Sequence, residues 1–232
     1  MLAILATLAA LAGPALAQGE RYTAVPASAD GIGKRYMGRE ISSVMGWQGA
    51  AWLERAERER EERTDLLMAA LALQPGLVVA DIGAGTGYLA RRMAKAVAPG
   101  GKVIATDVQP QMVRMLQKLS EQPGMGNLLP WLGDEQDVRL PAGQLDMAVL
   151  VDVYHELAYP WEVLQSVLRA LKPGGRLVLV EYKAEDAFVP IKTLHKMSEA
   201  QVRREAEVHG LLWERTVATL PWQHVVVFRK PR

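Results

Sequence analysis

Short apolar runs alternate with longer periodic segments from Gly76 to the end of the chain. Five nearly continuous apolar runs have the length of a strand: Leu77–Asp81, Lys102–Asp107, Asn127–Leu132, Leu145–Val151 and Arg176–Tyr182. Three segments between them repeat apolar residues every three or four positions: Thr86–Val97, one that begins at Pro110 and one that begins at Pro160. Strands that are apolar on both faces and are separated by helices predict a parallel sheet with helices on both sides.

The C-terminal part of the chain has a different pattern. Ser198 and Gln201 form a capping box, which predicts a helix that ends at Gly210. Two apolar stretches then flank Pro221-Trp222, as in an antiparallel hairpin. The whole pattern predicts one α/β domain over residues 76–232, with a doubly wound, mostly parallel seven-stranded sheet and a C-terminal antiparallel hairpin.

Residues 18–75 are predicted to form an N-terminal arm and a helix. Glu20–Gly49 is rich in small residues and proline with little periodicity, which favours an irregular arm. Ala50–Leu73 is typical of a helix and contains the charged block ERAEREREER. Its pairs Glu54–Arg58 and Glu59–Arg63 have favourable i,i+4 spacing and predict a solvent-exposed face. The alternative is a docking surface for a charged partner.

Residues 1–17 are interpreted as a signal peptide. The apolar run Leu2–Leu11 is broken by Gly13-Pro14, and Ala15-Leu16-Ala17 fits a cleavage site before Gln18. No Lys or Arg precedes Arg21, so the usual basic region is missing. The apolar run and the cleavage site nevertheless favour export, to the periplasm of a bacterium. If the start codon is wrongly assigned, the alternative is a cytoplasmic protein.

Composition excludes several classes of site. The 232 residues carry a formal net charge of +1, so no overall field favours nucleic acid as a partner. The chain has no cysteine, which excludes disulfides, thiol nucleophiles and thiolate metal sites. The apolar runs after the signal are only as long as strands, so no stable membrane insertion is expected after cleavage. Nothing in the pattern predicts an oligomeric state.

The first predicted strand runs into the glycine-rich turn DIGAGTG. Gly83, Gly85 and Gly87 have the spacing G-x-G-x-G rather than the dinucleotide pattern, and no Lys-Ser/Thr pair follows. Asp81 precedes them, where it would repel a pyrophosphate and attract a cation. Two unit charges about 4 Å apart interact by about 4 kcal/mol at an effective dielectric constant of about 20. S-adenosylmethionine, which carries a sulfonium and an ammonium group but no phosphate, is therefore the predicted ligand.

Two further carboxylates follow the next strands. Asp107 ends the second strand, where a carboxylate can accept hydrogen bonds from both ribose hydroxyls. Asp134 follows the third strand and could accept from the adenine amine. The alternatives are a surface acid at a strand end for Asp107 and an ordinary polar turn for Asp134, which has Glu135 and Asp137 beside it.

Residues 78–183 resemble the class I S-adenosylmethionine-dependent methyltransferases. The resemblance is carried by DIGAGTG, VIATD, GDEQDVRLPAGQLD and LKPGGRLVLVEY. It implies the Rossmann-like methyltransferase fold and a cofactor site in which Asp81 and the glycines hold the methionine part, Asp107 the ribose and Asp134 the adenine. LVDVYHEL and the RYMGREIS segment are similar to a less-characterised bacterial branch of the family with signal sequences.

The end of the fourth strand is expected to face the transferable methyl group. There His155 could be a general base, Asp152 could orient the ligand or the acceptor, and Tyr154 could cap a ring. Alternatively, His155 only begins the next helix and Asp152 only contacts the cofactor. No metal site is expected, because His195 lies far along the chain. His195 is interpreted as a surface residue or as part of the acceptor pocket, and Arg39 could pair with the cofactor carboxylate.

The function predicted is transfer of a methyl group from S-adenosylmethionine to a small-molecule acceptor at O, N or C. One alternative is a binding module that keeps the S-adenosylmethionine pocket without turnover. A nucleotide-dependent oxidoreductase is a further alternative, disfavoured by Asp81 and by the glycine spacing.

Overall fold

The computed structural model describes residues 21–232. The predicted signal peptide, residues 1–17, lies outside the described residues. Among the helices of residues 21–232, none combines the length and the apolar character that are needed to span a bilayer.

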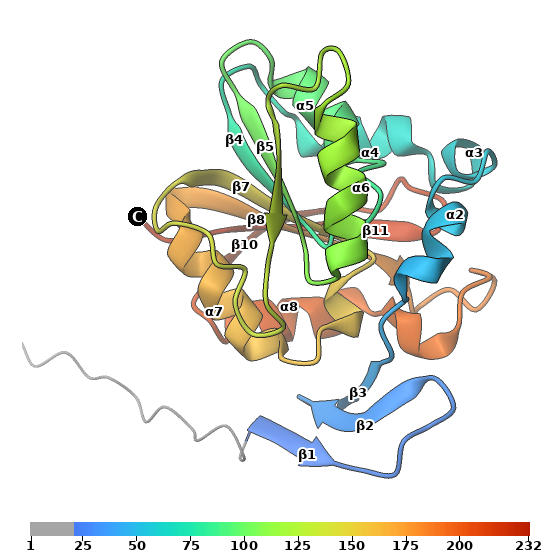
Figure 1. The fold of residues 1–232 in the computed structure, drawn as a ribbon. Coiled ribbons are helices and arrows are strands. Elements are labelled where there is room, and N and C mark those ends of the chain that lie inside the picture. Colours follow the sequence, from blue (N-terminus) through green and yellow to red (C-terminus); the bar gives the residue numbers. More distant parts are fainter. Residues whose placement is uncertain (1–20) are drawn as a thin grey trace, which may run out of the picture.

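A twisted central sheet with the strand order β10-β11-β8-β7-β4-β5-β6 organises the chain (Figure 1). Its strands are β4 (Val78–Ile82), β5 (Lys102–Asp107), β6 (Leu128–Leu132), β7 (Leu145–Val151), β8 (Leu171–Lys183), β10 (Leu212–Val217) and β11 (Gln223–Arg229). The pairs from β6 to β8 are parallel, whereas β11 is antiparallel to both β8 and β10. A two-residue strand, β9 (Lys196–Met197), pairs with the end of β8. The predicted doubly wound sheet with its C-terminal hairpin is thus confirmed.

Helices cover both faces of this sheet (Figure 1). One face packs against α4 (Thr64–Leu71), α5 (Ala90–Val97) and α6 (Pro110–Ser120), and the other against α7 (Pro160–Ala170) and α8 (Glu199–Glu207). The positions of Leu177–Val180 in β8 explain why this stretch is continuously apolar. Val178 and Val180 point into the first core, while Leu177 and Leu179 point into the second. Both faces of each central strand are therefore removed from water.

Local signals set most helix boundaries. Pro110 and Pro160 occupy the first turns of their helices, as expected, and the Ser198 hydroxyl accepts a hydrogen bond from Gln201 N at 3.2 Å. Helix α5 begins at Ala90 rather than at Thr86, because the glycine turn continues through Gly87, whose φ is +84°.

The N-terminal arm is a sheet, so the prediction of an irregular segment was wrong. Strands β1 (Tyr22–Ala24), β2 (Gly31–Tyr36) and β3 (Arg39–Ser42) form a three-stranded antiparallel sheet beyond the end of the main sheet (Figure 1). Only Tyr36 and Ile41 are large buried apolar residues in it. The arm is held to the main domain chiefly by polar contacts, so it carries little hydrophobic periodicity.

The segment Ala50–Leu73 is not one helix, which also corrects the prediction. It is divided into α2 (Ala50–Leu53), α3 (Arg58–Glu62) and α4, after a single 3-10 turn, η1 (Trp47–Gly49). Arg63 separates α3 from α4 with a left-handed φ of 52°. Arg58 and Glu62 are buried and pair with each other at 2.8 Å. The predicted solvent-exposed charged face is therefore wrong for these two residues.

A charge pair ties the arm sheet to the main domain. Arg39 in β3 donates from Nε and Nη2 to the fully buried carboxylate of Glu205 in α8, at 2.7 and 3.0 Å. Its Nη1 donates to the carbonyl oxygen of His155 at 3.1 Å. Arg39 is thus engaged by the protein and does not line the cavity described below, where it was expected to meet the cofactor carboxylate.

We expect Arg39→Ala to lower the free energy of unfolding by about 3–5 kcal/mol, because it leaves the Glu205 carboxylate buried without its cation. Urea denaturation followed by circular dichroism measures the change. Arg35→Ala, on the exposed side of the same small sheet, is the control and should shift stability by less than about 0.5 kcal/mol. Equal midpoints for the two variants would contradict the assigned role.

Candidate functional site

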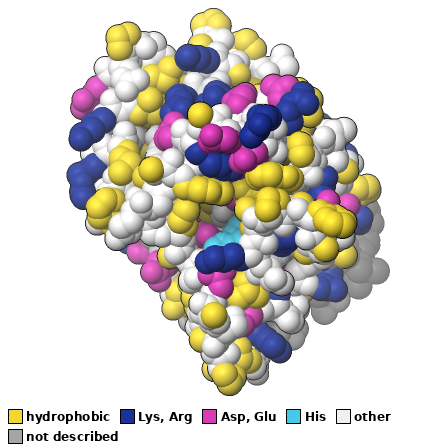
Figure 2. Space-filling view, turned by 90° about the vertical axis from the view of Figure 1, so that its right-hand side faces the viewer, with side chains coloured by type: hydrophobic (Ala, Val, Ile, Leu, Met, Phe, Trp, Pro, Cys, Tyr) yellow, Lys and Arg dark blue, Asp and Glu magenta, His cyan; other side chains and the backbone are white. Residues whose placement is uncertain are grey.

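A cavity of about 700 Å³ opens at the carboxyl ends of β4, β5 and β7. This is the edge at which ligands bind in doubly wound sheets. The segment that follows β3 covers it, and Met45 O and Trp47 N are hydrogen-bonded to the side chain of Gln109. Figure 2 shows a hollow with histidine at its floor and hydrophobic side chains around it. Much of the wall is apolar and includes Val44, Met45, Val108, Val153, Leu157 and Ile191.

The glycine turn forms one wall of the cavity. Gly83 and Gly85 line it, with φ values of +73° and +56° that L side chains rarely adopt. A Cβ atom on Gly83 would lie 2.6 Å from Cγ2 of Val153. Gly87 does not line the cavity, since its Cα packs against leucine side chains of α6. Of the three predicted cofactor glycines, two therefore reach the ligand space.

Asp81 lies in the sheet behind this turn rather than in the cavity wall. Its side chain is 3% exposed, and Oδ2 has no hydrogen-bond partner. Burial raises the pKa of Asp81 to about 7, against the lowering effect of the Arg58 guanidinium. Asp81, which was predicted to hold the methionine part, therefore does not line the cavity.

Asp107 and Asp134 both line the cavity, as expected for the nucleoside end. Asp107 accepts hydrogen bonds from Gly85 N at 3.0 Å and from Gln109 N at 2.9 Å, so backbone groups fix its carboxylate. Each carboxylate oxygen retains a lone pair for a further donor. Burial raises the pKa of Asp107. Asp134 is more exposed and pairs with Arg139 at 2.8 Å.

Asp152 follows β7 and lines the same cavity. Its φ is +56°, an uncommon conformation for a residue with a side chain and one that is often found at functional sites. Oδ2 accepts from Gln223 Nε2 at 2.9 Å, whereas Oδ1 is buried without a partner. Burial and the nearby Glu62 raise the pKa of Asp152 well above its usual range. The carboxyl group is thus poised to meet a positively charged ligand.

His155 lines the cavity and is 1% exposed. It lies in a single 3-10 turn, η2 (Tyr154–Glu156), and its Nδ1 is 2.5 Å from Oε2 of Glu181 in β8. Burial lowers the pKa of His155 to about 3 and raises that of Glu181 to about 8, because it penalises the charged form of each. Glu181 also accepts from Tyr154 N at 3.0 Å, so this one carboxyl group positions the turn.

Tyr154 does not reach the cavity. Its ring is fully buried in the core beneath α7 and α8, with the Arg39 guanidinium 5.5 Å from its centre. The predicted role of capping an acceptor ring therefore has no geometric basis. Tyr154 and His155 are neighbours in the 3-10 turn, and their side chains point to different sides of it, so only His155 reaches the cavity.

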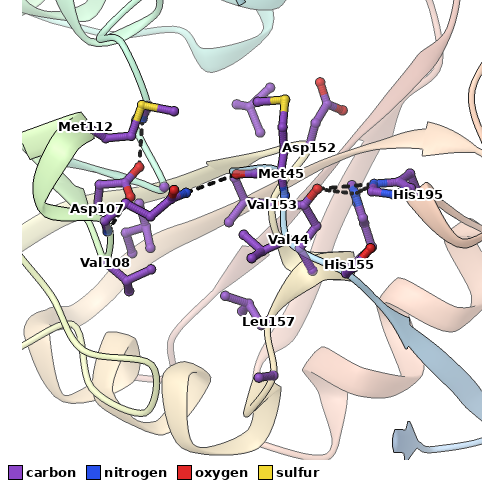
Figure 3. A pocket seen from close by; sticks show the side chains of 18 of the residues that line it. Val44, Met45, Asp107, Val108, Met112, Asp152, Val153, His155, Leu157 and His195 are labelled. Atoms are coloured by element: carbon purple, nitrogen blue, oxygen red, sulfur yellow. Dashed lines mark hydrogen bonds and ion pairs between the residues drawn. The ribbon is translucent and has the colours of Figure 1, made fainter. Parts of the chain in front are cut away.

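Two further side chains line the cavity: Arg58, which was not predicted as a site residue, and His195, which was predicted either at the surface or in the acceptor pocket. Arg58 is 5% exposed and lines the cavity, although it belongs to a charged block in which nothing distinguishes one arginine from the next. His195 also lines the cavity, and its Nδ1 lies 3.1 Å from Nε2 of His155 (Figure 3). Pairing of β9 with β8 brings His195 there, which no local signal encodes.

Figure 3 shows the division of the cavity into two ends. Asp107 lies at one end and the His155–His195 pair at the other, with the apolar side chains of Val44, Val153 and Leu157 between them. The carboxylate-rich end is suited to a nucleoside with hydroxyl and amine donors. The apolar middle and the histidine end leave room for a second molecule.

Comparison with known proteins gives matches to this part of the chain. Residues 80–177 match the family model described as a methyltransferase domain. The ubiquinone/menaquinone biosynthesis C-methyltransferase UbiE of Ectopseudomonas mendocina is 32% identical over 111 residues, which cover 47% of this chain and 43% of that protein. UbiE of Pseudomonas aeruginosa is 31% identical over 126 residues, covering 50% and 49%. The chain thus spans about half the length of the curated relatives it matches.

Solved structures share the fold. A SAM-dependent methyltransferase from Aquifex aeolicus superposes with a TM-score of 0.75 at 24% identity, covering 80% of this chain and 99% of that one. The [4+2]-cyclase SpnF superposes with a TM-score of 0.63 at 18% identity, covering 72% and 79%. Residues 80–177 therefore match a methyltransferase domain, and the doubly wound fold around them is shared with solved methyltransferase structures.

Proposed function

We propose that this protein transfers a methyl group from S-adenosylmethionine to a small, largely apolar acceptor at O, N or C. The observation that carries the proposal is the set of strand-end carboxyl groups around one cavity. Asp107, Asp134 and Asp152 line it, and Asp81 lies behind the glycine turn; Asp81 and Asp152 each have one buried oxygen atom without a hydrogen-bond partner. Such acceptors suit a ligand that combines hydroxyl, amine and cationic groups.

The residues present fit S-adenosylmethionine along its length. Asp107 and Asp134 would accept from the ribose hydroxyls and the adenine amine. At the other end, the unpartnered Oδ1 of Asp152 would accept from the ammonium group, and Arg58 would pair with the carboxylate. When bound, S-adenosylmethionine supplies the electrophilic methyl group. The chain aligns the two molecules and excludes water, and alignment alone can contribute about 7–11 kcal/mol.

The acceptor is proposed from the shape and the chemistry of the remaining space. The apolar wall around Val153 and Leu157 favours a small molecule over a nucleic acid or a long polar peptide. The UbiE relatives are named for quinone biosynthesis, which supports a small-molecule acceptor. His155 is the candidate for activating it, because Nδ1 is held by Glu181 while Nε2 points to His195 at the cavity wall.

Calorimetry with S-adenosylmethionine, S-adenosylhomocysteine and NAD, followed by incubation with methyl-labelled donor and a small-molecule extract, tests the proposal. We expect both sulfur nucleosides to bind, NAD not to bind, and label to enter the small-molecule fraction. Binding without transfer to any fraction would favour the binding module. Binding of NAD alone would overturn the proposal in favour of an oxidoreductase.

Gly83→Ala should weaken binding of S-adenosylhomocysteine by at least about tenfold, because the new methyl group meets Val153 and displaces the wall of the cavity. Isothermal titration calorimetry measures the change. Gly124→Ala is the matched control, since Gly124 also has a positive φ of 82° but has open space around it. Both variants should lose about 1–2 kcal/mol of stability. If both also retained full affinity, the glycine wall would not contact the ligand.

Affinity for S-adenosylmethionine should rise with pH through about 7, the pKa of Asp81 without ligand. The carboxylate form attracts the cationic ligand, so protonation of Asp81 below this pH weakens binding, by up to about tenfold per pH unit. Binding measured between pH 5.5 and 8.5 tests this. In the Asp81→Asn variant, Asp152 is still present and the ligand's own ionisable groups still titrate. The variant should therefore bind S-adenosylmethionine weakly, and its affinity should change less with pH. An unchanged profile in Asp81→Asn would remove Asp81 from donor selection.

A further inference from the structure

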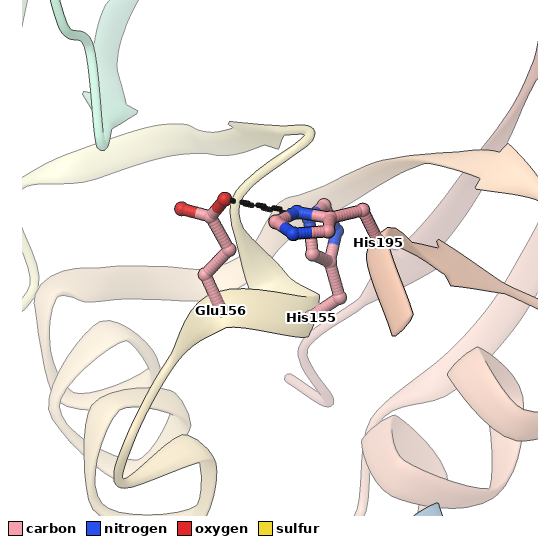
Figure 4. A group of neighbouring side chains, drawn as sticks. All are labelled: His155, Glu156 and His195. Atoms are coloured by element: carbon pink, nitrogen blue, oxygen red, sulfur yellow. Dashed lines mark hydrogen bonds and ion pairs between the residues drawn. The ribbon is translucent and has the colours of Figure 1, made fainter. Parts of the chain in front are cut away.

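Three side chains converge at the histidine end of the cavity. His155, Glu156 and His195 all line the cavity, and each directs one ligand-type atom towards the others (Figure 4). Nε2 of His155 is 3.1 Å from Nδ1 of His195 and 3.8 Å from Oε1 of Glu156, and that oxygen is 3.2 Å from Nδ1 of His195. Two imidazole nitrogens and one carboxylate oxygen therefore form a compact triangle.

The size of this triangle fits a metal ion. Three atoms with these separations can all lie about 2.1 Å from one point slightly outside their plane, which matches the Zn–N distance of about 2.0–2.1 Å. An ion at this point lies to one side of the plane of the three ligand atoms, as in a tetrahedral site that has three protein ligands and one open position. Two imidazoles and a carboxylate select borderline divalent transition ions over Mg²⁺ or Ca²⁺, which prefer oxygen ligands throughout.

The atoms behind the triangle hold its members in place. Nδ1 of His155 is 2.5 Å from the Glu181 carboxyl group, and Nε2 of His195 is 2.9 Å from Oδ2 of Asp30. Both imidazoles thus have a carboxyl group on the nitrogen that faces away from the triangle. This is the arrangement that orients histidine ligands in metal sites.

The carboxylate member is also fixed. Oε2 of Glu156 accepts from Met45 N at 3.2 Å, which turns Oε1 towards the two histidines. The supports come from distant parts of the chain, since Asp30 and Met45 belong to the N-terminal arm and Glu181 to β8. His195 is 17% exposed in its side chain and lies at the cavity wall, so an ion could enter from the cavity.

We propose that His155, Glu156 and His195 form a binding site for a divalent transition metal ion of the zinc type, with one coordination position open to the acceptor end of the cavity. The ion would bind an oxygen or nitrogen donor of the acceptor molecule. This second statement rests on the proposed methyl transfer, whereas metal binding itself does not. His155 is then a ligand that acts on the acceptor through the ion rather than as a free base.

Titration of the chelator-treated full chain with ZnCl2, by calorimetry and by competition with a chromophoric chelator, tests the site. We expect one Zn²⁺ per chain and no detectable binding of Mg²⁺. His195→Gln and Glu156→Gln should each weaken Zn²⁺ binding by at least about tenfold, while affinity for S-adenosylhomocysteine stays within about twofold. Co²⁺ in place of Zn²⁺ should give the visible absorption of a four-coordinate ion.

His209→Gln is the matched control, because His209 lies on the far side of α7, stacked on Trp161 and bonded to Gln165. It should leave Zn²⁺ binding unchanged. Absence of stoichiometric binding to the wild-type chain, or equal affinity in His195→Gln and His209→Gln, would overturn the metal site. Donor binding is read separately, so a failure of the metal site and a failure of the proposed methyl transfer give different results.

Discussion

Carboxyl groups buried at the carboxyl ends of parallel strands are the constraint on which this molecule depends. Asp81 lies next to the last residue of β4, Asp152 follows β7, and Glu181 lies near the end of β8. Burial raises the pKa of each, because the ionised form has lost water without gaining enough partners. A cationic ligand in the adjacent cavity would relieve this penalty. The buried carboxyl groups at this edge of the sheet therefore favour the binding of a positively charged ligand.

The elements of the main domain could be predicted because their signals are local. Strands buried on two faces are continuously apolar, prolines mark the first turns of α6 and α7, and Ser198 caps α8. The ends of β4, β5 and β7 then meet at one edge whatever the details of packing, which places Asp107 and Asp152 near one cavity. Sheet topology alone thus makes strand-end residues good candidates for a site.

The remaining features arise from contacts between distant segments. The arm sheet is stabilised by pairs such as Arg39 with Glu205, which are 166 positions apart and look like ordinary surface charges in the sequence. Arg58 is buried in a segment that divides into short helices, and one division is at Arg63, which has a left-handed φ although it is not a glycine. His195 approaches His155 only through the pairing of β9 with β8. Single-sequence periodicity carries no information about such pairings.

The boundaries of the matched region have a consequence for specificity. Residues 80–177 contain the glycine turn, Asp107, Asp134 and the 3-10 turn with His155. Asp30, Met45, Glu181 and His195 all lie outside it, yet they form or support the histidine end of the cavity. The proposed donor end and the proposed acceptor end of the cavity are therefore formed largely by separate stretches of the chain. A protein that shares only residues 80–177 with this chain would then share most of the proposed donor site without the residues that surround the second molecule.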